Sequence, residues 1–182
     1  MVEIAIIGNG SHGRMLKAIF KDQADFFMPD DLPDEMFVCI GIGNVPKIGD
    51  SGLSTRRKLF EQYDGRLVGI CHPTAVVLGE VDSTCQVMPT AVINPNARVM
   101  HNTIINTGAI VEHDCVIGPH CHIAPGATVL GGVTIGEETH VGANSVILPG
   151  KKIGNGCIIG ACAVVTDNME DGETWIGNEL YD

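Results

Sequence analysis

A six-residue repeat fills the second half of the sequence and limits what the chain can fold into. Starting at Val81, every sixth residue is valine or isoleucine over fifteen consecutive positions. A period of six matches neither a helix nor a plain alternating strand. Each repeat must therefore be a short strand and a turn, and three repeats close a triangular coil of 18 residues. The aliphatic positions are Val81, Val87, Ile93, Val99, Ile105, Val111, Ile117, Ile123, Val129, Ile135, Val141, Ile147, Ile153, Ile159 and Val165.

A second column of small residues runs in phase with the first. Most members lie two residues before an aliphatic position, at a corner where a larger side chain would clash with the turn. We interpret the cysteines among them as packing residues. No loop interrupts the repeats, so we expect a plain prism of nearly five coils. The small residues are Cys85, Ala91, Ala97, Thr103, Ala109, Cys115, Cys121, Ala127, Thr139, Ser145, Cys157 and Ala163.

The first 72 residues lack this repeat and instead alternate apolar runs with helical patterns. We expect a Rossmann-like α/β unit at residues 1–72, with three parallel strands, and a β-helix at residues 73–182 that ends in a short tail. His72 and Pro73 mark the change between the two. The predicted strands are Ile4–Gly8, Met36–Gly43 and Arg66–Cys71, and the predicted helices are Arg14–Lys21 and Ser54–Tyr63.

A glycine-rich turn joins the first predicted strand to the first predicted helix. Residues 8–13 read G-x-G-x-x-G, a pattern that places backbone amides and a helix N-terminus against a phosphate. Asp30 and Asp31 fall near the distance at which an acidic residue binds a ribose. Three strands are too few for a full dinucleotide domain, so the turn favours a single nucleotide. A purely structural turn is the alternative.

Composition excludes several classes of protein. The net charge is -11 and only 11 of 182 residues are Lys or Arg, so nucleic acid is not an expected partner. The seven cysteines show no C-x-x-C spacing, and no apolar leader follows the N-terminus. No apolar run approaches the ~20 residues that span a bilayer. We therefore expect a cytoplasmic protein.

Several histidines lie within the repeats. His113 comes two residues after an interior valine, where we expect its side chain to point outward. One coil of 18 residues places His140 above His122 and Gly131 above His113.

Glycine gathers in two outward columns toward the C-terminus. Glycine in a strand costs stability and often marks the close approach of a ligand or chain. We expect an extended ligand along these columns, and tight coil geometry alone is the alternative. The columns are Asp82, Met100, Gly118, Gly136, Gly154 and Met88, Asn106, Ala124, Gly142, Gly160.

Together these features resemble the hexapeptide-repeat sugar acyltransferases of the PglD and NeuD type. The resemblance rests on the glycine turn, the Asp30-Asp31 pair, the segment G-I-G-N, and above all N-T-G-A-I-V-E-H-D-C-V-I-G-P-H-C-H-I-A-P-G-A at residues 106–127. It implies that the β-helix is left-handed and parallel. It also implies acetyl-CoA as co-substrate, a nucleotide-sugar as acceptor, and no metal.

The resemblance further implies roles for individual residues. His113 is the general base, and Asp114 is the carboxylate that raises its basicity. The implied acetyl-CoA-binding residues are His122, Gly131, Ala143 and Ala161. The implied substrate-binding residues are Gly10, Ser11, His12, Asp30, Asp31, Gly43 and Asn106.

These residue types suit the implied chemistry. A sugar amine or hydroxyl loses a proton as it attacks a thioester, and a histidine of near-neutral pKa can accept that proton. We therefore expect N-acetylation of the 4-amino group of a nucleotide-linked amino-dideoxy sugar by direct attack on acetyl-CoA. O-acetylation of a sialic acid is the alternative within the family. A zinc-dependent hydratase of the same fold and a non-catalytic trimeric scaffold are the alternatives outside it, although no His-x4-His spacing is present.

The expected assembly is a homotrimer of parallel prisms. A groove between neighbouring prisms is the natural place for CoA, so we expect each active centre to take residues from two chains.

Overall fold

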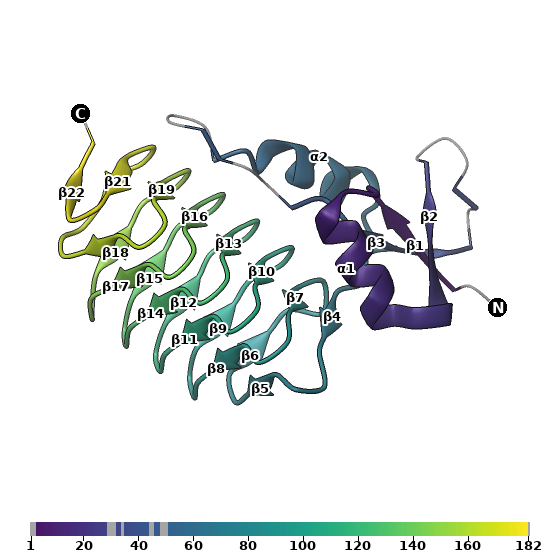
Figure 1. Ribbon diagram of the computed structural model, residues 1–182, viewed down its shortest axis with the longest axis horizontal. Coiled ribbons are helices and arrows are strands. Elements are labelled where there is room, and N and C mark those ends of the chain that lie inside the picture. Colours follow the sequence, from purple (N-terminus) through teal and green to yellow (C-terminus); the bar gives the residue numbers. More distant parts are fainter. Residues whose placement is uncertain (1–2, 29–31, 34, 44–45, 48–50, 182) are drawn as a thin grey trace.

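The computed structural model describes residues 3–28, 32–33, 35–43, 46–47 and 51–181. A small α/β unit lies beside a long three-sided prism, and the chain climbs the prism coil by coil to the C-terminus at its far end (Figure 1). Within the described residues, no helix combines the length and apolar character needed to cross a membrane.

The N-terminal unit is built on a parallel sheet of three strands in the order β2-β1-β3. Ile6 of β1, Leu16 of α1 and Cys39 of β3 are buried together in its core. The elements in chain order are β1 (Ile4–Ile7), α1 (Ser11–Phe20), a 3-10 helix (Lys21–Gln23), β2 (Ala24–Phe27), β3 (Phe37–Ile40) and α2 (Ser54–Gln62).

One predicted strand of this unit is wrong. The third strand of the sheet is β2, whereas the predicted strand Arg66–Cys71 contributes only an isolated bridge between Leu67 and Val38. The last residues of that segment form β4 (Ile70–Cys71), which pairs with β7 (Gln86–Val87) of the prism. The reason is that this segment already packs on the first coil of the prism. The Gly69 backbone lies so close to that coil that an added Cβ would be 1.8 Å from the Cys85 carbonyl oxygen.

The prism has three sheet faces made of short strands, which stack in parallel except for the last strand, β22. The eight-stranded sheet contains β4, β7, β10, β13, β16, β19, β21 and β22, the six-stranded sheet β5, β8, β11, β14, β17 and β20, and the five-stranded sheet β6, β9, β12, β15 and β18. Their bounds are β5 Val76–Val77, β6 Glu80–Val81, β8 Val92–Ile93, β9 Arg98–Val99, β10 Ile104–Ile105, β11 Ile110–Val111, β12 Val116–Ile117, β13 His122–Ile123, β14 Thr128–Val129, β15 Thr134–Ile135, β16 His140–Val141, β17 Val146–Ile147, β18 Lys152–Ile153, β19 Ile158–Ile159, β20 Val164–Val165, β21 Thr174–Ile176 and β22 Glu179–Leu180.

The predicted interior of the prism is confirmed. From Val87 to Val165 every residue of the aliphatic column is buried in one core cluster, and Val81 packs against it. Each coil lies 18 residues above the last, as in the pairing of Ile104 with His122 and of His122 with His140. The repeat therefore fixes which residues stack.

The small residues of the second column are also buried, which confirms their packing role. The thiols of Cys85 and Cys121 donate hydrogen bonds to the carbonyls of Met100 and Gly136 in the next coil, at 3.0 and 2.9 Å. Burial raises the pKa of both thiols to about 12, so they stay protonated and inert.

The glycine columns have a different cause from the expected one. An added Cβ at Gly118 would lie 2.6 Å from the backbone of Gly136, and one at Gly142 would lie 2.5 Å from the backbone of Gly160. These glycines therefore admit the next coil rather than a ligand, which supports the alternative of tight coil geometry.

The two parts of the chain are joined by a buried polar contact. The Arg56 side chain, on α2, donates to the carbonyls of Ile40 in the N-terminal unit and Asn102 in the prism, at 3.0 and 3.1 Å. Gln86 of the eight-stranded sheet donates to the same Ile40 carbonyl at 2.8 Å. Because a buried polar group without partners is costly, these bonds fix how the N-terminal unit lies on the prism.

A hairpin closes the far end of the prism. Strands β21 and β22 pair antiparallel, and Figure 1 shows them beyond the last coils. Trp175 of β21 is buried in the prism core and donates from Nε1 to the Val164 carbonyl at 3.0 Å.

Loss of one interior side chain should weaken the prism far more than loss of its neighbour on the outer face. Ile117 is fully buried, whereas Val116 of the same strand is partly exposed. Ile117→Ala should lower the free energy of unfolding by about 2–5 kcal/mol. Val116→Ala should cost less than about 1 kcal/mol. Urea unfolding at fixed protein concentration measures both, and equal losses would contradict the assigned interior.

Candidate active site

His113 and Asp114 lie at an outer corner of the prism, directly after β11. The His113 side chain is 63% exposed, which confirms that it points away from the interior. Its Nδ1 lies 2.7 Å from Asp114 Oδ2, and the other carboxylate oxygen accepts a hydrogen bond from Asn96 Nδ2 at 3.0 Å. Asn96 comes from the coil below, 18 residues earlier.

The pair is electrostatically suited to proton transfer. The hydrogen bond to Asp114 raises the pKa of His113 above its ordinary value. The hydrogen bonds from His113 and Asn96 lower the pKa of Asp114. The carboxylate is therefore ionised at neutral pH, and a neutral His113 keeps its proton on Nδ1. Nε2 is left to accept a proton.

Gly131 lies against the His113 ring, as its predicted place one coil above requires. An added Cβ at Gly131 would lie 2.8 Å from both Cε1 and Nε2 of the imidazole. The missing side chain at position 131 is therefore what makes room for the ring.

A separate pocket of about 500 Å³ lies where α1 and the end of β3 meet the eight-stranded sheet. Six of the predicted site residues line this pocket together: Gly10, Ser11, His12, Gly43, Asn106 and His122. The predicted Asp30 and Asp31 lie outside the described residues. The glycine turn and the repeat motif, far apart in sequence, thus form one cavity.

His12 enters the pocket from the first turn of α1. Its Nε2 lies 2.8 Å from Gln86 Oε1, and the Gln86 amide nitrogen donates to the Ile40 carbonyl. Because the amide nitrogen is a donor there, Gln86 Oε1 is an acceptor and His12 Nε2 carries the hydrogen. Burial lowers the pKa of His12, so the ring stays neutral at pH 7.

His122, on β13, lines the same pocket and is held neutral. The Thr107 amide donates to Asn106 Oδ1 at 2.8 Å, which orients the Asn106 side chain so that its Nδ2 donates to His122 Nε2 at 2.9 Å. The His140 ring meets His122 edge to face at 5.1 Å. Burial lowers the pKa of His122 well below its ordinary value and that of His140 to about 4.

The remaining predicted residues follow the same edge of the prism beyond the pocket. Ala143 and Ala161 lie one and two coils above Pro125, which lines the pocket. The sequence interpretation missed Asn96 and Gln86. Counting 18 residues back from Asp114 finds Asn96, because coils stack at that interval, whereas no local pattern indicated Gln86.

A single chain does not bring all the predicted residues together. His113 follows a strand of the six-stranded sheet and is not among the pocket residues, which face the eight-stranded sheet. Within the part of the chain that the structure describes, no group of three or more His, Cys, Asp and Glu side chains is arranged to hold a metal ion.

The histidines should titrate in an order set by their surroundings. NMR titration of histidine-labelled protein should give His113 a pKa above 6.5, because Asp114 favours its charged form. His140 should give a pKa of about 4, and His122 should stay neutral until well below 6.5, because burial opposes their charged forms. If His122 gained its charge before His113, the assigned surroundings of both rings would be wrong.

Comparison with known proteins supports this architecture. The bacterial transferase hexapeptide family (six repeats) matches residues 96–131 and 132–167. No curated protein matches the sequence at a significant level.

Several solved structures match over nearly the whole chain. The acetyltransferase domain of PglB from Neisseria gonorrhoeae FA1090 is 25% identical, with a TM-score of 0.86 over 100% of this chain and 99% of that one. PerB from Caulobacter crescentus, solved with CoA and GDP-perosamine, is 26% identical, with a TM-score of 0.85 over 98% of this chain and 97% of that one. WeeI from Acinetobacter baumannii AYE shares the fold at 23% identity, with a TM-score of 0.80 and 98% of each chain covered. The chain thus carries bacterial transferase hexapeptide repeats behind a Rossmann-like α/β unit, in a left-handed parallel β-helix, and over its whole length it is similar to the sugar acyltransferases of the PglD and NeuD type.

Proposed function

We propose that the protein transfers the acetyl group of acetyl-CoA to the 4-amino group of a nucleotide-linked amino-dideoxy sugar. The observation that carries this proposal is the full-length likeness to PerB, an enzyme solved with CoA and GDP-perosamine. The PglB domain, of similar likeness, is an acetyltransferase by name. CoA and GDP-perosamine were observed in PerB and not in this chain. The residues that line the pocket of this chain give separate support for the proposal.

The pocket of the N-terminal unit suits a nucleotide-sugar. Gly10 is the N-cap of α1 and has no side chain to cap it, so the first backbone amides of the helix are available to a phosphate. The neutral His12 and the polar Asn106 line the same cavity and can hydrogen-bond to hydroxyl groups. We assign Gly10, Ser11, His12, Gly43 and Asn106 to the acceptor, with Asp30 and Asp31 as further candidates.

The chemical step needs one base and no covalent enzyme intermediate. The acceptor nitrogen forms a bond to the thioester carbonyl carbon, and the bond from that carbon to sulfur breaks. The proton of the amine passes to His113 Nε2 and then to the departing CoA thiolate. Asp114 stabilises the imidazolium that forms, and the neutral His122 is suited to contact the acetyl group. Gly131, Ala143 and Ala161 complete the proposed acetyl-CoA path.

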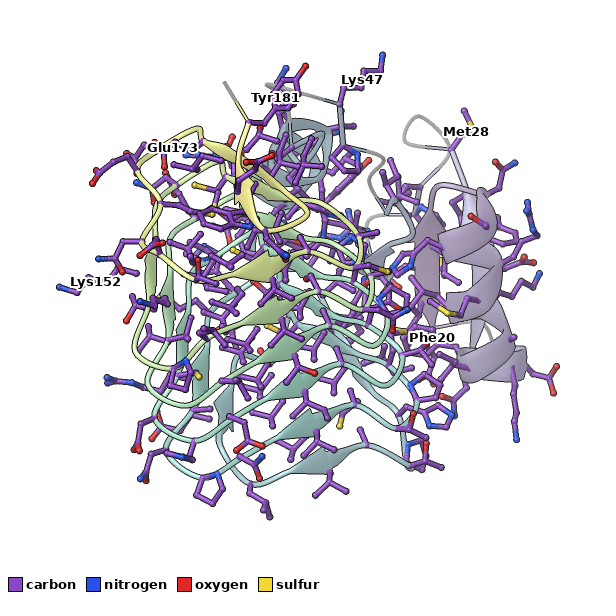
Figure 2. The ribbon with its side chains drawn as sticks, turned by 60° about the vertical axis from the view of Figure 1, so that its left-hand side comes forward. Phe20, Met28, Lys47, Lys152, Glu173 and Tyr181 are labelled. Carbon is purple, nitrogen blue, oxygen red and sulfur yellow. The ribbon has the colours of Figure 1, made fainter. Side chains whose placement is uncertain are left out.

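The functional unit in this proposal is a homotrimer. The outward side chains of the six-stranded sheet are Val76, Val92, Ile110, Thr128, Val146 and Val164. All of these are exposed or partly exposed, and five of the six are apolar. Those of the five-stranded sheet are Glu80, Arg98, Val116, Thr134 and Lys152. Figure 2 shows Lys152 pointing into solvent on the side away from Phe20 of α1.

An apolar outer sheet face favours contact with a second copy of the chain. His113 lies at the edge of this face. Packing against it brings His113 of one chain toward the pocket of its neighbour, which joins the base to the acceptor site.

His113→Ala should lower kcat by a factor of about 10²–10⁴ with little change in the fold, because only the proton acceptor is lost. Release of CoA thiol from acetyl-CoA measures turnover against GDP-, UDP- and dTDP-linked 4-amino sugars. Activity on these acceptors and none on free sialic acids supports the N-acetyl transfer. Preference for sialic acids would show O-acetyl transfer instead. Near-normal turnover of His113→Ala would show that His113 is not the base.

Mixed trimers test whether each site spans two chains. Gly10→Phe should fill the pocket without backbone strain, because Gly10 has a φ of -65° and an added Cβ there meets nothing within 4 Å. Each of Gly10→Phe and His113→Ala alone should lose at least about 99% of the activity. Refolded together in equal amounts, they should recover about a quarter of the sites by random assembly. No recovery, with trimers formed, would place both residues of a site on one chain.

A further inference from the structure

We propose that Asn96 and Gly131, one coil below and one coil above His113, are positioning residues that hold its imidazole with Nδ1 on Asp114 and Nε2 open to the acceptor. This inference rests on the proposed function, in which His113 is the general base. It assigns a role to Asn96, a residue of the outer corner that does not line the pocket beside α1.

Asn96 orients the carboxylate across a coil boundary. Asp114 uses Oδ2 for His113 and Oδ1 for Asn96, so both oxygens are engaged and the carboxylate plane is fixed. Both Asn96 and Asp114 have left-handed backbones, with φ of 63° and 61°. Asparagine and aspartate adopt this conformation more readily than most residues, which lets the two corners stack with their side chains in reach.

The bond from Asn96 to Asp114 lies at the surface, so its contribution to stability is small. Its effect is on orientation. A free carboxylate beside an exposed histidine rotates among several rotamers, and only some of them face Nδ1. A carboxylate held from the opposite side stays in the rotamer that accepts from the imidazole.

Gly131 leaves the space that the ring occupies on the other side. Gly118 and Gly142 of the two columns face backbone of the next coil, whereas the three atoms nearest to an added Cβ at Gly131 all belong to the His113 ring. The φ of Gly131 is not in the left-handed region, so the backbone itself permits alanine there. The absence of a side chain at 131 is therefore tied to the place of the imidazole rather than to the turn.

The charged groups near His113 are few. Asp114 provides its largest electrostatic influence, and Glu112 adds a weaker attraction for the charged ring. Glu80 and Arg98 line a recess of about 340 Å³ beside Asn96 and Asp114. Residues 130–132 of the coil above carry no charge. A change in the titration of His113 on substitution of Asn96 thus reports on Asp114.

The first test replaces the amide without straining the corner. Asn96→Gly keeps a residue that accepts positive φ and removes only the side chain. The pKa of His113, measured by NMR, should fall toward its ordinary value, by less than in Asp114→Asn. The kcat should fall by about threefold to tenfold, the range of one net hydrogen bond. The KM for acetyl-CoA should not change, because the contact acts on the base rather than on binding.

The double variant Asn96→Gly with Asp114→Asn separates positioning from a general effect. If Asn96 acts through the carboxylate, its removal should add nothing once the carboxylate is gone. Thr90→Gly is the matched control, because Thr90 is an exposed left-handed corner residue of the same coil at a φ of 59°. It should leave kcat and the pKa of His113 as they are.

The second test crowds the ring. Gly131→Ala should move the imidazole, because the ring is the flexible partner in the collision, so the NMR signals of His113 shift and kcat falls while the melting temperature holds.

Two results would overturn the proposal: an unchanged His113 pKa in Asn96→Gly, or losses from Asn96→Gly and Asp114→Asn that simply add. Full turnover of His113→Ala would instead refute the proposed function, while the NMR titrations would still report on the positioning contacts.

Discussion

The structure depends on the stacking of branched side chains inside a triangular coil. Because valine and isoleucine recur every six residues and fill one continuous core from Val87 to Val165, each coil must lie directly on the last. That constraint also determines which outward-facing side chains lie next to one another. Residues 18 apart become neighbours, and the chain thereby joins groups that no local motif connects. The contacts between polar side chains on the outer surface are therefore a consequence of the packing in the interior.

The contact between His113 and Asp114 illustrates this consequence. Asn96, Asp114 and Gly131 come from three successive coils, yet they surround one imidazole. The same stacking puts His140 on His122 inside the prism's covered face, where burial keeps both rings neutral. His113 and the stacked pair of His122 and His140 thus have opposite charge tendencies, because His113 faces solvent beside a carboxylate and the pair is buried. Proton transfer suits His113, and neutral hydrogen bonding suits the pair.

Much of this could be predicted from sequence, because the repeat determines where each residue lies in the prism. The interior column, the buried cysteines, the outward His113 and the stacked histidines all follow from counting. The gathering of Gly10, His12 and Asn106 around one pocket required the family resemblance, since no periodicity relates the two parts of the chain. The strand Ala24–Phe27 was missed because an aspartate interrupts its apolar run, and the glycine columns were misjudged because coil-to-coil contact is invisible in a single repeat.

In the proposed trimer, the base on one chain serves the acceptor held by another. A crystal structure of the protein with CoA and a nucleotide-linked 4-amino sugar would show whether it does. We expect a trimer in which the sugar amine lies about 2.6–3.2 Å from His113 Nε2 of one chain while its nucleotide lies in the pocket of the adjacent chain. A sugar bound in that pocket with its amine far from every His113 in the assembly would contradict it.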